Sequence, residues 1–262
     1  MIDFFSIIAI GFFLGMRHAT DPDHVIAVTS IVSRQNKISR AALTGIFWGV
    51  GHTLTILVVG TGIILFGIVI PARIGLSMEL SVGLMLVLLG AMNVAAFMRS
   101  APALERVEGQ AMAHTHSHSH GDYIHPHPHG YVHAPDKTPL ARMDGFFGGT
   151  GVYRALRPLL VGIVHGLAGS AAVALLVLTA IRDPRWAVAY LLVFGAGTVA
   201  GMMLITMSIA SAFTFFGRRY ANFSSRLALA SGLLSLAFGL LLLYQIGIAG
   251  GLFSGHPHWT PR

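Results

Sequence analysis

The 262-residue sequence contains no cysteine and few charged residues. Without cysteine there is no disulfide framework, no thiolate metal ligand and no dithiol redox centre, so metal ligands must come from histidine, carboxylate, methionine or backbone groups. Charged residues make up only 10% of the chain, whereas hydrophobic residues make up 54% and the mean hydropathy is +0.71. This balance excludes an ordinary soluble domain and is typical of a polytopic membrane protein.

Several functional motifs are also missing. The chain contains no G-x4-G-K-S/T nucleotide-binding motif and no H-E-x-x-H or G-x-S-x-G protease motif. The first hydrophobic run lacks a preceding basic segment and a small-residue cleavage site, so we expect a retained span rather than a signal peptide. Most of the net charge of +7 lies in short loops. It therefore reports orientation in the membrane and indicates no nucleic-acid partner.

Six apolar stretches reach the roughly 20 residues of helix that a bilayer requires. They lie near residues 4–33, 42–70, 78–98, 157–181, 186–216 and 224–249. We therefore predict an all-α polytopic membrane protein with six transmembrane helices. Its parts are a first three-helix repeat in 1–98, a flexible His-rich loop in 99–156, a second three-helix repeat in 157–250 and a short tail in 251–262.

The two halves of the sequence resemble each other. Gly15-Met-Arg-His18 recurs as Gly162-Ile-Val-His165, and glycines in the other spans match at nearly the same offset. Because each copy has three spans, the second copy crosses the membrane in the opposite sense. This predicts a 3+3 inverted repeat, an arrangement that many secondary transporters use. The alternative is the general similarity of helices rich in glycine and leucine.

The distribution of basic residues predicts the orientation. Arginine and lysine are concentrated after the first, third and fifth predicted spans, and the positive-inside rule places such loops in the cytoplasm. We therefore expect a multi-pass protein of the bacterial cytoplasmic membrane with both termini outside and the His-rich loop inside.

A polar segment interrupts the first predicted span. Residues 16–24 read Met-Arg-His-Ala-Thr-Asp-Pro-Asp-His, and ionisable groups at membrane depth cost several kcal/mol unless they are paired, ligated or facing a wet cavity. Pro22 removes an amide donor, so we expect a broken helix. His18 and His24 would point in different directions on an unbroken helix, and the break would bring them together.

This segment offers imidazole and carboxylate ligands, which suit divalent nickel, cobalt, zinc and manganese. Further imidazoles come from the second predicted span and from the second repeat. The predicted metal ligands are His18, Asp21, Asp23, His24, His52 and His165. Purely structural roles are the alternatives: an ion pair of Arg17 with either aspartate, or interhelical hydrogen bonds made by a lone histidine or by Asn93.

A second group of histidines lies between the third and fourth spans. Eight of the fourteen histidines fall within residues 114–133: His114, His116, His118, His120, His125, His127, His129 and His133. Histidine alternating with serine, threonine and proline cannot build a core, so we expect a disordered stretch that serves as an auxiliary metal-binding loop. A solvated linker that binds metal only adventitiously is the alternative.

These motifs resemble those of the nickel/cobalt transporter family. Residues 18–24 fit its H-x4-D-H signature, and Gly51-His52-Thr53 is similar to its second histidine motif. The segments that begin at Arg157 and Gly195 resemble the fourth- and fifth-span motifs of its six-span, urease-accessory-type nickel permeases. The resemblance implies metal recognition by His18, Asp23 and His24. The chain departs from the eight-span permeases in its span number and in lacking their later Asp-Thr-rich signature.

The sequence therefore predicts a secondary transporter that moves Ni2+ or Co2+ across the cytoplasmic membrane, without enzymatic activity and without a permanently bound cofactor. One alternative is an accessory protein that passes nickel to enzyme-maturation proteins through its His-rich loop. Another is a divalent-metal efflux protein. The choice of metal, the direction, the coupling ion and the oligomeric state stay open at this stage.

Overall fold

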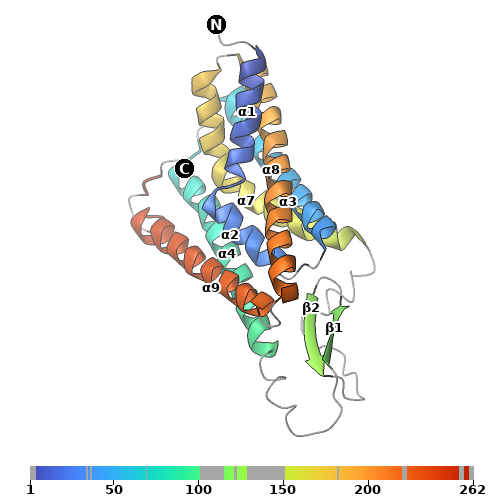
Figure 1. Ribbon diagram of the computed structural model, residues 1–262. Coiled ribbons are helices and arrows are strands. Elements are labelled where there is room, and N and C mark those ends of the chain that lie inside the picture. Colours follow the sequence, from blue (N-terminus) through green and yellow to red (C-terminus); the bar gives the residue numbers. More distant parts are fainter. Residues whose placement is uncertain are drawn as a thin grey trace.

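Helices form almost all of the regular structure described here. The computed structural model describes residues 4–33, 35, 37–68, 70–100, 115–120, 123–128, 151–181, 183–219, 223–253 and 257–259. The helices lie side by side in an elongated bundle (Figure 1). In chain order the elements are α1 (Phe4–His18), α2 (Pro22–Val32), α3 (Ile38–Phe66), α4 (Ala72–Ser100), β1 (Thr115–His120), β2 (Tyr123–Pro128), α7 (Gly151–Ala180), α8 (Pro184–Arg219), α9 (Phe223–Tyr244) and a π-helical turn (Gln245–Ala249).

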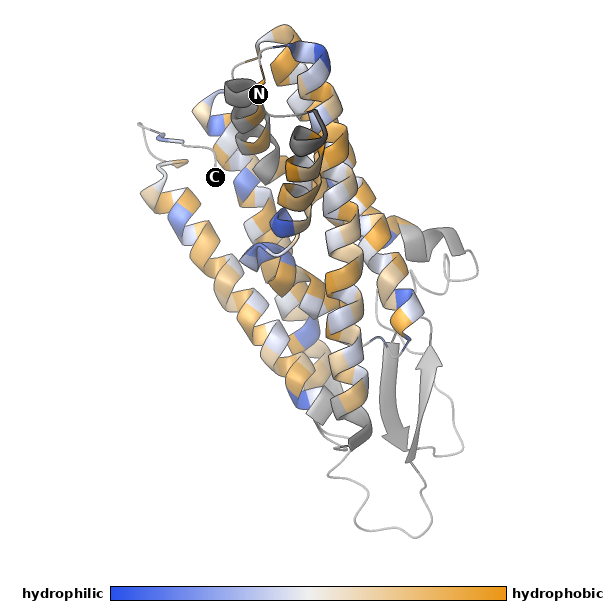
Figure 2. Cartoon of the chain, turned by 45° about the horizontal axis from the view of Figure 1, so that its top comes forward, coloured by the Kyte–Doolittle hydropathy of each residue, from blue (hydrophilic) through white to orange (hydrophobic). Residues whose placement is uncertain are grey.

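The length and composition of the helices agree with a polytopic membrane protein. Within the described residues, four segments are long and apolar enough to cross a bilayer: Ile38–Phe66, Ala72–Met98, Pro184–Phe215 and Ser225–Ala249. Shorter apolar segments cover Ile8–His18, Pro22–Val32 and Leu156–Ala168. Hydrophobic residues predominate along the long helices (Figure 2). Many large apolar side chains are exposed, as expected where lipid takes the place of water.

The first predicted span consists of two helices separated by a short turn. α1 ends at His18 and α2 begins at Pro22. In the turn, the Thr20 hydroxyl donates to the Arg17 carbonyl oxygen at 2.6 Å. Proline is well tolerated at the first position of a helix, where its missing amide hydrogen would have no intrahelical acceptor. Pro22 therefore starts a new helix, and the predicted break lies immediately before it.

Helix packing places α3 at the centre of the bundle. α3 packs most extensively against α7 and α8, α1 packs against α8, and α4 packs against α9. Trp48, Val28, Leu86 and Met202 are almost completely buried in one core shared by α2, α3, α4 and α8. The turn that follows α1 joins this core through Ala19. The break between α1 and α2 therefore packs against the core on one side, at Ala19, whereas Thr20 and Pro22 are exposed on the other.

A β-hairpin adds to the predicted all-α architecture. β1 and β2 pair in antiparallel fashion, from Thr115 opposite Pro128 to His120 opposite Tyr123. The composition of this stretch predicted no regular structure, because it lacks the alternating apolar residues by which strands are usually recognised. Of the loop histidines, His114, His129 and His133 lie outside the described residues.

Candidate metal site

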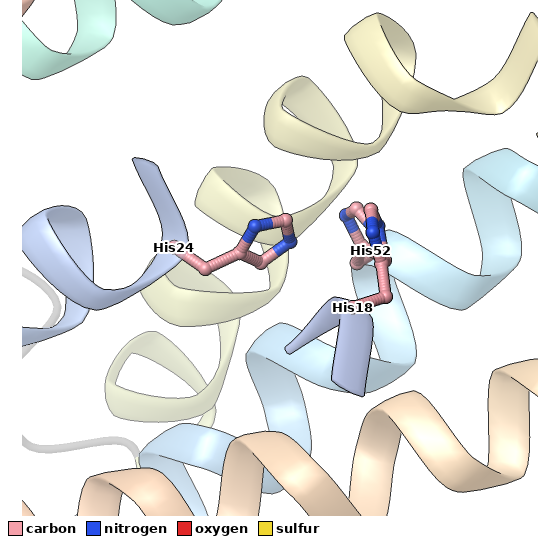
Figure 3. Close-up of side chains that lie close together, drawn as sticks. All are labelled: His18, His24 and His52. Carbon is pink, nitrogen blue, oxygen red and sulfur yellow. The ribbon is translucent and has the colours of Figure 1, made fainter. Parts of the chain in front are cut away.

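Four histidines and one aspartate from four helices meet at one point inside the bundle. His18 ends α1, Asp23 and His24 lie in the first turn of α2, His52 is in the middle of α3, and His165 is in α7. The His24 ring centroid lies 4.8 Å from that of His18, 4.9 Å from that of His52 and 4.2 Å from that of His165. His24 therefore occupies the centre of the cluster. In Figure 3 its ring faces the rings of His18 and His52.

His18, His24 and His52 form one group that could hold a metal ion. One ring nitrogen of each lies within 4.8 Å of the others, and the Nε2 atoms of His18 and His52 are only 3.1 Å apart. His24 and His52 are 2% and 1% exposed. The helix break makes this group possible, because it lets side chains six positions apart face the same point.

Asp23, His24 and His165 form a second such group, which shares His24 with the first. The two carboxylate oxygens of Asp23 contact different rings. Oδ1 lies 3.1 Å from His24 Nδ1, and Oδ2 lies 3.1 Å from His165 Nε2. Asp23 thus connects α2 to α7. Its carboxylate is either an ion ligand or the acceptor that orients both imidazoles.

Asp21 lies outside both groups. Its Oδ2 is 2.8 Å from His18 Nδ1, and its side chain is 49% exposed. When His18 Nδ1 donates a hydrogen to this carboxylate, His18 Nε2 keeps its lone pair and faces His52. The arrangement is typical of a carboxylate that fixes the tautomer and orientation of a metal-binding histidine. The structure therefore places Asp21 behind His18 rather than beside the other candidate ligands.

Several nitrogens at this point are buried without a partner. His24 Nε2, His52 Nδ1 and His165 Nδ1 have no hydrogen-bond partner among the described residues. Leaving such a group unsatisfied costs about 1–3 kcal/mol. Unpaired imidazole nitrogens from three helices therefore lower the stability of the fold unless a bound ion or molecule interacts with them.

Two aromatic rings that were not predicted from the sequence border the cluster. The Trp48 ring centroid is 5.7 Å from that of His165, and the Phe194 ring centroid is 5.5 Å from that of His18. Trp48 lies one helical turn before His52 and is fully buried. Residues four positions apart lie on the same face of a helix, so the spacing between Trp48 and His52 could have predicted that Trp48 lies beside the cluster.

The purely structural roles predicted for Arg17 and Asn93 are not both found in the structure. Arg17 is exposed, and within the described part of the chain it forms no ion pair with Asp21 or Asp23. Asn93 donates from Nδ2 to the Ser30 carbonyl oxygen at 2.7 Å. It therefore links α4 to α2, which is the interhelical role.

The helices and this cluster together define a class of protein: a polytopic membrane protein with a buried group of imidazoles and carboxylate between its helices. Residues 4–246 match the NicO family, described as high-affinity nickel-transport protein. The chain belongs to this family. It is therefore an integral membrane protein that transports nickel, and it is not an enzyme.

One curated relative is the urease accessory protein UreH of Bacillus sp. (strain TB-90). It is 34% identical over 253 residues, which cover 97% of this chain and 97% of the relative. No solved structure matches the chain.

Proposed function

We propose that the chain is a secondary transporter that carries Ni2+ or Co2+ across the cytoplasmic membrane. In this proposal His18, Asp23, His24, His52 and His165 form the ion-binding site, and Asp21 orients His18. The observation that carries the proposal is the convergence of four helices on one buried point, where three imidazole nitrogens have no partner among the described residues. A transported ion supplies the missing partner.

The closest pair of nitrogens could share one ion. Two nitrogens bound to one ion at about 2.1 Å lie about 3 Å apart when the two bonds are perpendicular. The Nε2 atoms of His18 and His52 are 3.1 Å apart, so both could bind one ion with little movement.

The donor set supports discrimination against the abundant cellular cations. Mg2+ and Ca2+ prefer oxygen ligands, whereas this cluster offers four imidazoles and a single carboxylate. The high donor count also compensates a divalent ion for the water that it loses on entering the bundle. We therefore expect nickel and cobalt to be transported and magnesium to be excluded.

We also propose that the six spans, with α1 and α2 counted as one, form an inverted repeat. A Cβ atom at Gly15 would collide with the Phe194 carbonyl oxygen, and a Cβ atom at Gly162 would collide with the Trp48 carbonyl oxygen. Gly15 and Gly162 are 147 positions apart, and Trp48 and Phe194 are 146 apart. The two contacts are therefore the same contact made reciprocally, which supports a two-fold relation between the halves.

Other helix contacts obey the same relation. A Cβ atom at Gly51 would collide with the Leu159 carbonyl oxygen, and one at Gly197 with that of Phe12. Gly51 and Gly197 are 146 positions apart, and Phe12 and Leu159 are 147 positions apart. In this relation α1, α3 and α4 correspond to α7, α8 and α9. Exchanging the two halves therefore converts the α1–α8 packing into the α3–α7 packing. It leaves the α3–α8 and α4–α9 pairs unchanged.

The repeat gives a physical basis for alternating access. His18 and His165 occupy equivalent positions, so the site lies between the halves, where relative movement of the halves exposes it to one side and then to the other. With no nucleotide-binding motif in the chain, the membrane potential is one driving force. It provides about 2.3 kcal/mol per charge per 100 mV, which favours entry of a divalent cation into the cytoplasm.

Flux of radiolabelled Ni2+ into proteoliposomes tests the proposal. His24→Ala should abolish saturable flux, because His24 belongs to both groups of candidate ligands. Asn93→Leu is a matched control, since it changes a buried polar residue that serves interhelical packing and should leave nickel affinity unchanged. Normal flux in a His24→Ala protein that inserts correctly would refute the site. Flux measured in both orientations decides between uptake and efflux.

The relative's name supports a second candidate function, in which the chain delivers nickel to an enzyme-maturation system. In that case residues 114–133 would carry the function. Deleting them would abolish nickel delivery, whereas His18→Ala would have little effect. The transporter predicts the opposite order of severity.

A further inference from the structure

Trp48 and Phe194 occupy equivalent positions in the two halves of the chain. They are 146 positions apart, and the histidines that their rings contact, His165 and His18, are 147 positions apart. The ring centroids of Trp48 and His165 are 5.7 Å apart. Those of Phe194 and His18 are 5.5 Å apart. One aromatic ring therefore lies against each of two equivalent candidate ligands.

His18 and His165 are the two ends of the cluster. The His24 ring contacts both of their rings, and so does the His52 ring. Within the described part of the chain, no ring contact joins His18 directly to His165. Trp48 therefore borders one end of the cluster, and Phe194 borders the other.

The two helices that carry these rings, α3 and α8, run in opposite directions. The Thr53 hydroxyl donates a hydrogen bond to the Gly195 carbonyl oxygen at 3.2 Å. A Cβ atom at Gly49 would collide with Val199. Residue numbers thus rise along α3 while they fall along the neighbouring part of α8. The helices are therefore antiparallel, and rings that precede the cluster on each helix point to opposite ends of the bundle.

The two rings are consequently separated along the bundle. Trp48 directly precedes Gly49, so it lies about level with position 200 of α8, six positions beyond Phe194. At a rise of 1.5 Å per residue, six positions correspond to about 9 Å. His52, the cluster member on α3, lies between these two levels.

We propose that Trp48 and Phe194 are the two gates of the ion site, each of which closes the site toward one face of the membrane. This inference rests on the proposed transport function and adds the residues that separate the site from the two aqueous sides. A hydrated ion cannot pass an apolar constriction from which water is excluded. Trp48 lies on the N-terminal side of His52 in α3, toward a basic loop, so the positive-inside rule makes it the cytoplasmic gate.

The two ends of the cluster are not equally closed. The His165 side chain is 1% exposed, whereas that of His18 is 17% exposed. Trp48 is fully buried, and its indole N–H has no acceptor among the described residues. Movement of this ring toward water would satisfy the N–H and break no hydrogen bond made by the side chain. The Trp48 gate is therefore the more tightly closed one, and packing alone opposes its opening.

A single reporter cysteine tests the gates, because the chain contains no cysteine. His52→Cys places the reporter in the cluster, and a membrane-impermeant thiol reagent is added to one side of sealed proteoliposomes of known orientation. Adding Trp48→Ala should raise the labelling rate from one side, and adding Phe194→Ala should raise it from the opposite side. A minor conformation is typically about 0.1–10% populated, so opening a gate permanently should accelerate labelling at least about tenfold.

Leu86→Ala is the matched control. Leu86 is fully buried in α4, a helix that contributes no residue to the cluster. The control loses buried apolar volume as the gate variants do, and it should leave labelling unchanged from both sides. If an alanine variant does not fold, Trp48→Leu and Phe194→Leu replace the pair and should show the same sidedness with a smaller increase.

The labelling assay uses no nickel, so it separates the gates from the ion site. Calorimetric titration of the intact protein with Ni2+ tests the site alone. Labelling from opposite sides without Ni2+ binding would support the gates and refute the proposed function. Increases from the same side in both gate variants, or no increase in variants that fold, would overturn the gates and leave the two rings a packing role.

Discussion

Asp21 provides the most discriminating test of the proposed intramembrane site, because the sequence predicted that it is a metal ligand, whereas the structure places it behind the candidate ligand His18. Its carboxylate contacts His18 Nδ1 at 2.8 Å and belongs to neither group of candidate ligands. Losing the partner that orients a metal-binding histidine typically lowers metal affinity about 10–100-fold. This range corresponds to about 1.4–2.8 kcal/mol of binding free energy.

Asp21→Ala should therefore weaken nickel binding within this range without unfolding the protein. The side chain is 49% exposed, and although Asp21 is the N-cap residue of α2, its side chain makes no capping hydrogen bond. Asp21→Asn retains an oxygen acceptor for His18 Nδ1 and should recover part of the affinity. Asp23→Ala should be more damaging than either variant, because Asp23 contacts two imidazoles.

Calorimetric titration with Ni2+ and the concentration dependence of flux in proteoliposomes measure these effects. For Asp21→Ala we expect a higher KM with a maximal rate close to that of the intact protein. Affinity equal to that of the intact protein would refute the orienting role. Loss of binding as complete as in Asp23→Ala would instead identify Asp21 as a direct ligand.

Three further predictions follow from the packing and the site. Gly51→Leu places a side chain against the Leu159 carbonyl oxygen. It should lower the free energy of unfolding by at least about 1–3 kcal/mol, which is typical of overpacking. Gly62→Ala is the control, because its added Cβ atom meets only a side-chain atom at 3.6 Å, and it should leave the melting temperature in detergent unchanged. Asn93→Leu removes the hydrogen bond to Ser30 and should lower stability by about 0.6–1.7 kcal/mol, again measured by melting. His165→Ala should weaken nickel binding less than His24→Ala, because His165 belongs to one candidate group and His24 to both; equal losses in calorimetry would contradict the shared position of His24.

The sequence was sufficient to predict the class of protein and the proximity of His18 and His24. Low charge and long apolar stretches predict membrane helices because a helix satisfies its backbone hydrogen bonds within one segment in lipid. The same reasoning makes the polar segment of residues 16–24 conspicuous, since its cost at membrane depth requires compensation. The break before Pro22 and the convergence of His18 and His24 follow from that segment and are present in the structure.

Contacts between distant helices could not be predicted in this way. Local patterns describe which face a residue occupies on its own helix, whereas the partner of that face depends on how all the helices pack. The sequence predicted that His165 belongs to the site, but its specific contact with Asp23 and the ring contacts of Trp48 and Phe194 are of this kind. The strand register of the His-rich stretch likewise depends on pairing that composition does not encode.

Asp21 and Asp23 illustrate the division most clearly. Both are carboxylates beside Pro22, and by residue type and position they are equivalent candidates for a metal ligand. The sequence by itself determined that a carboxylate-rich helix break would lie within the membrane-spanning part of the chain. Only the tertiary structure gave the two side chains different partners, because α2 directs Asp23 toward α7 and the preceding turn leaves Asp21 beside His18.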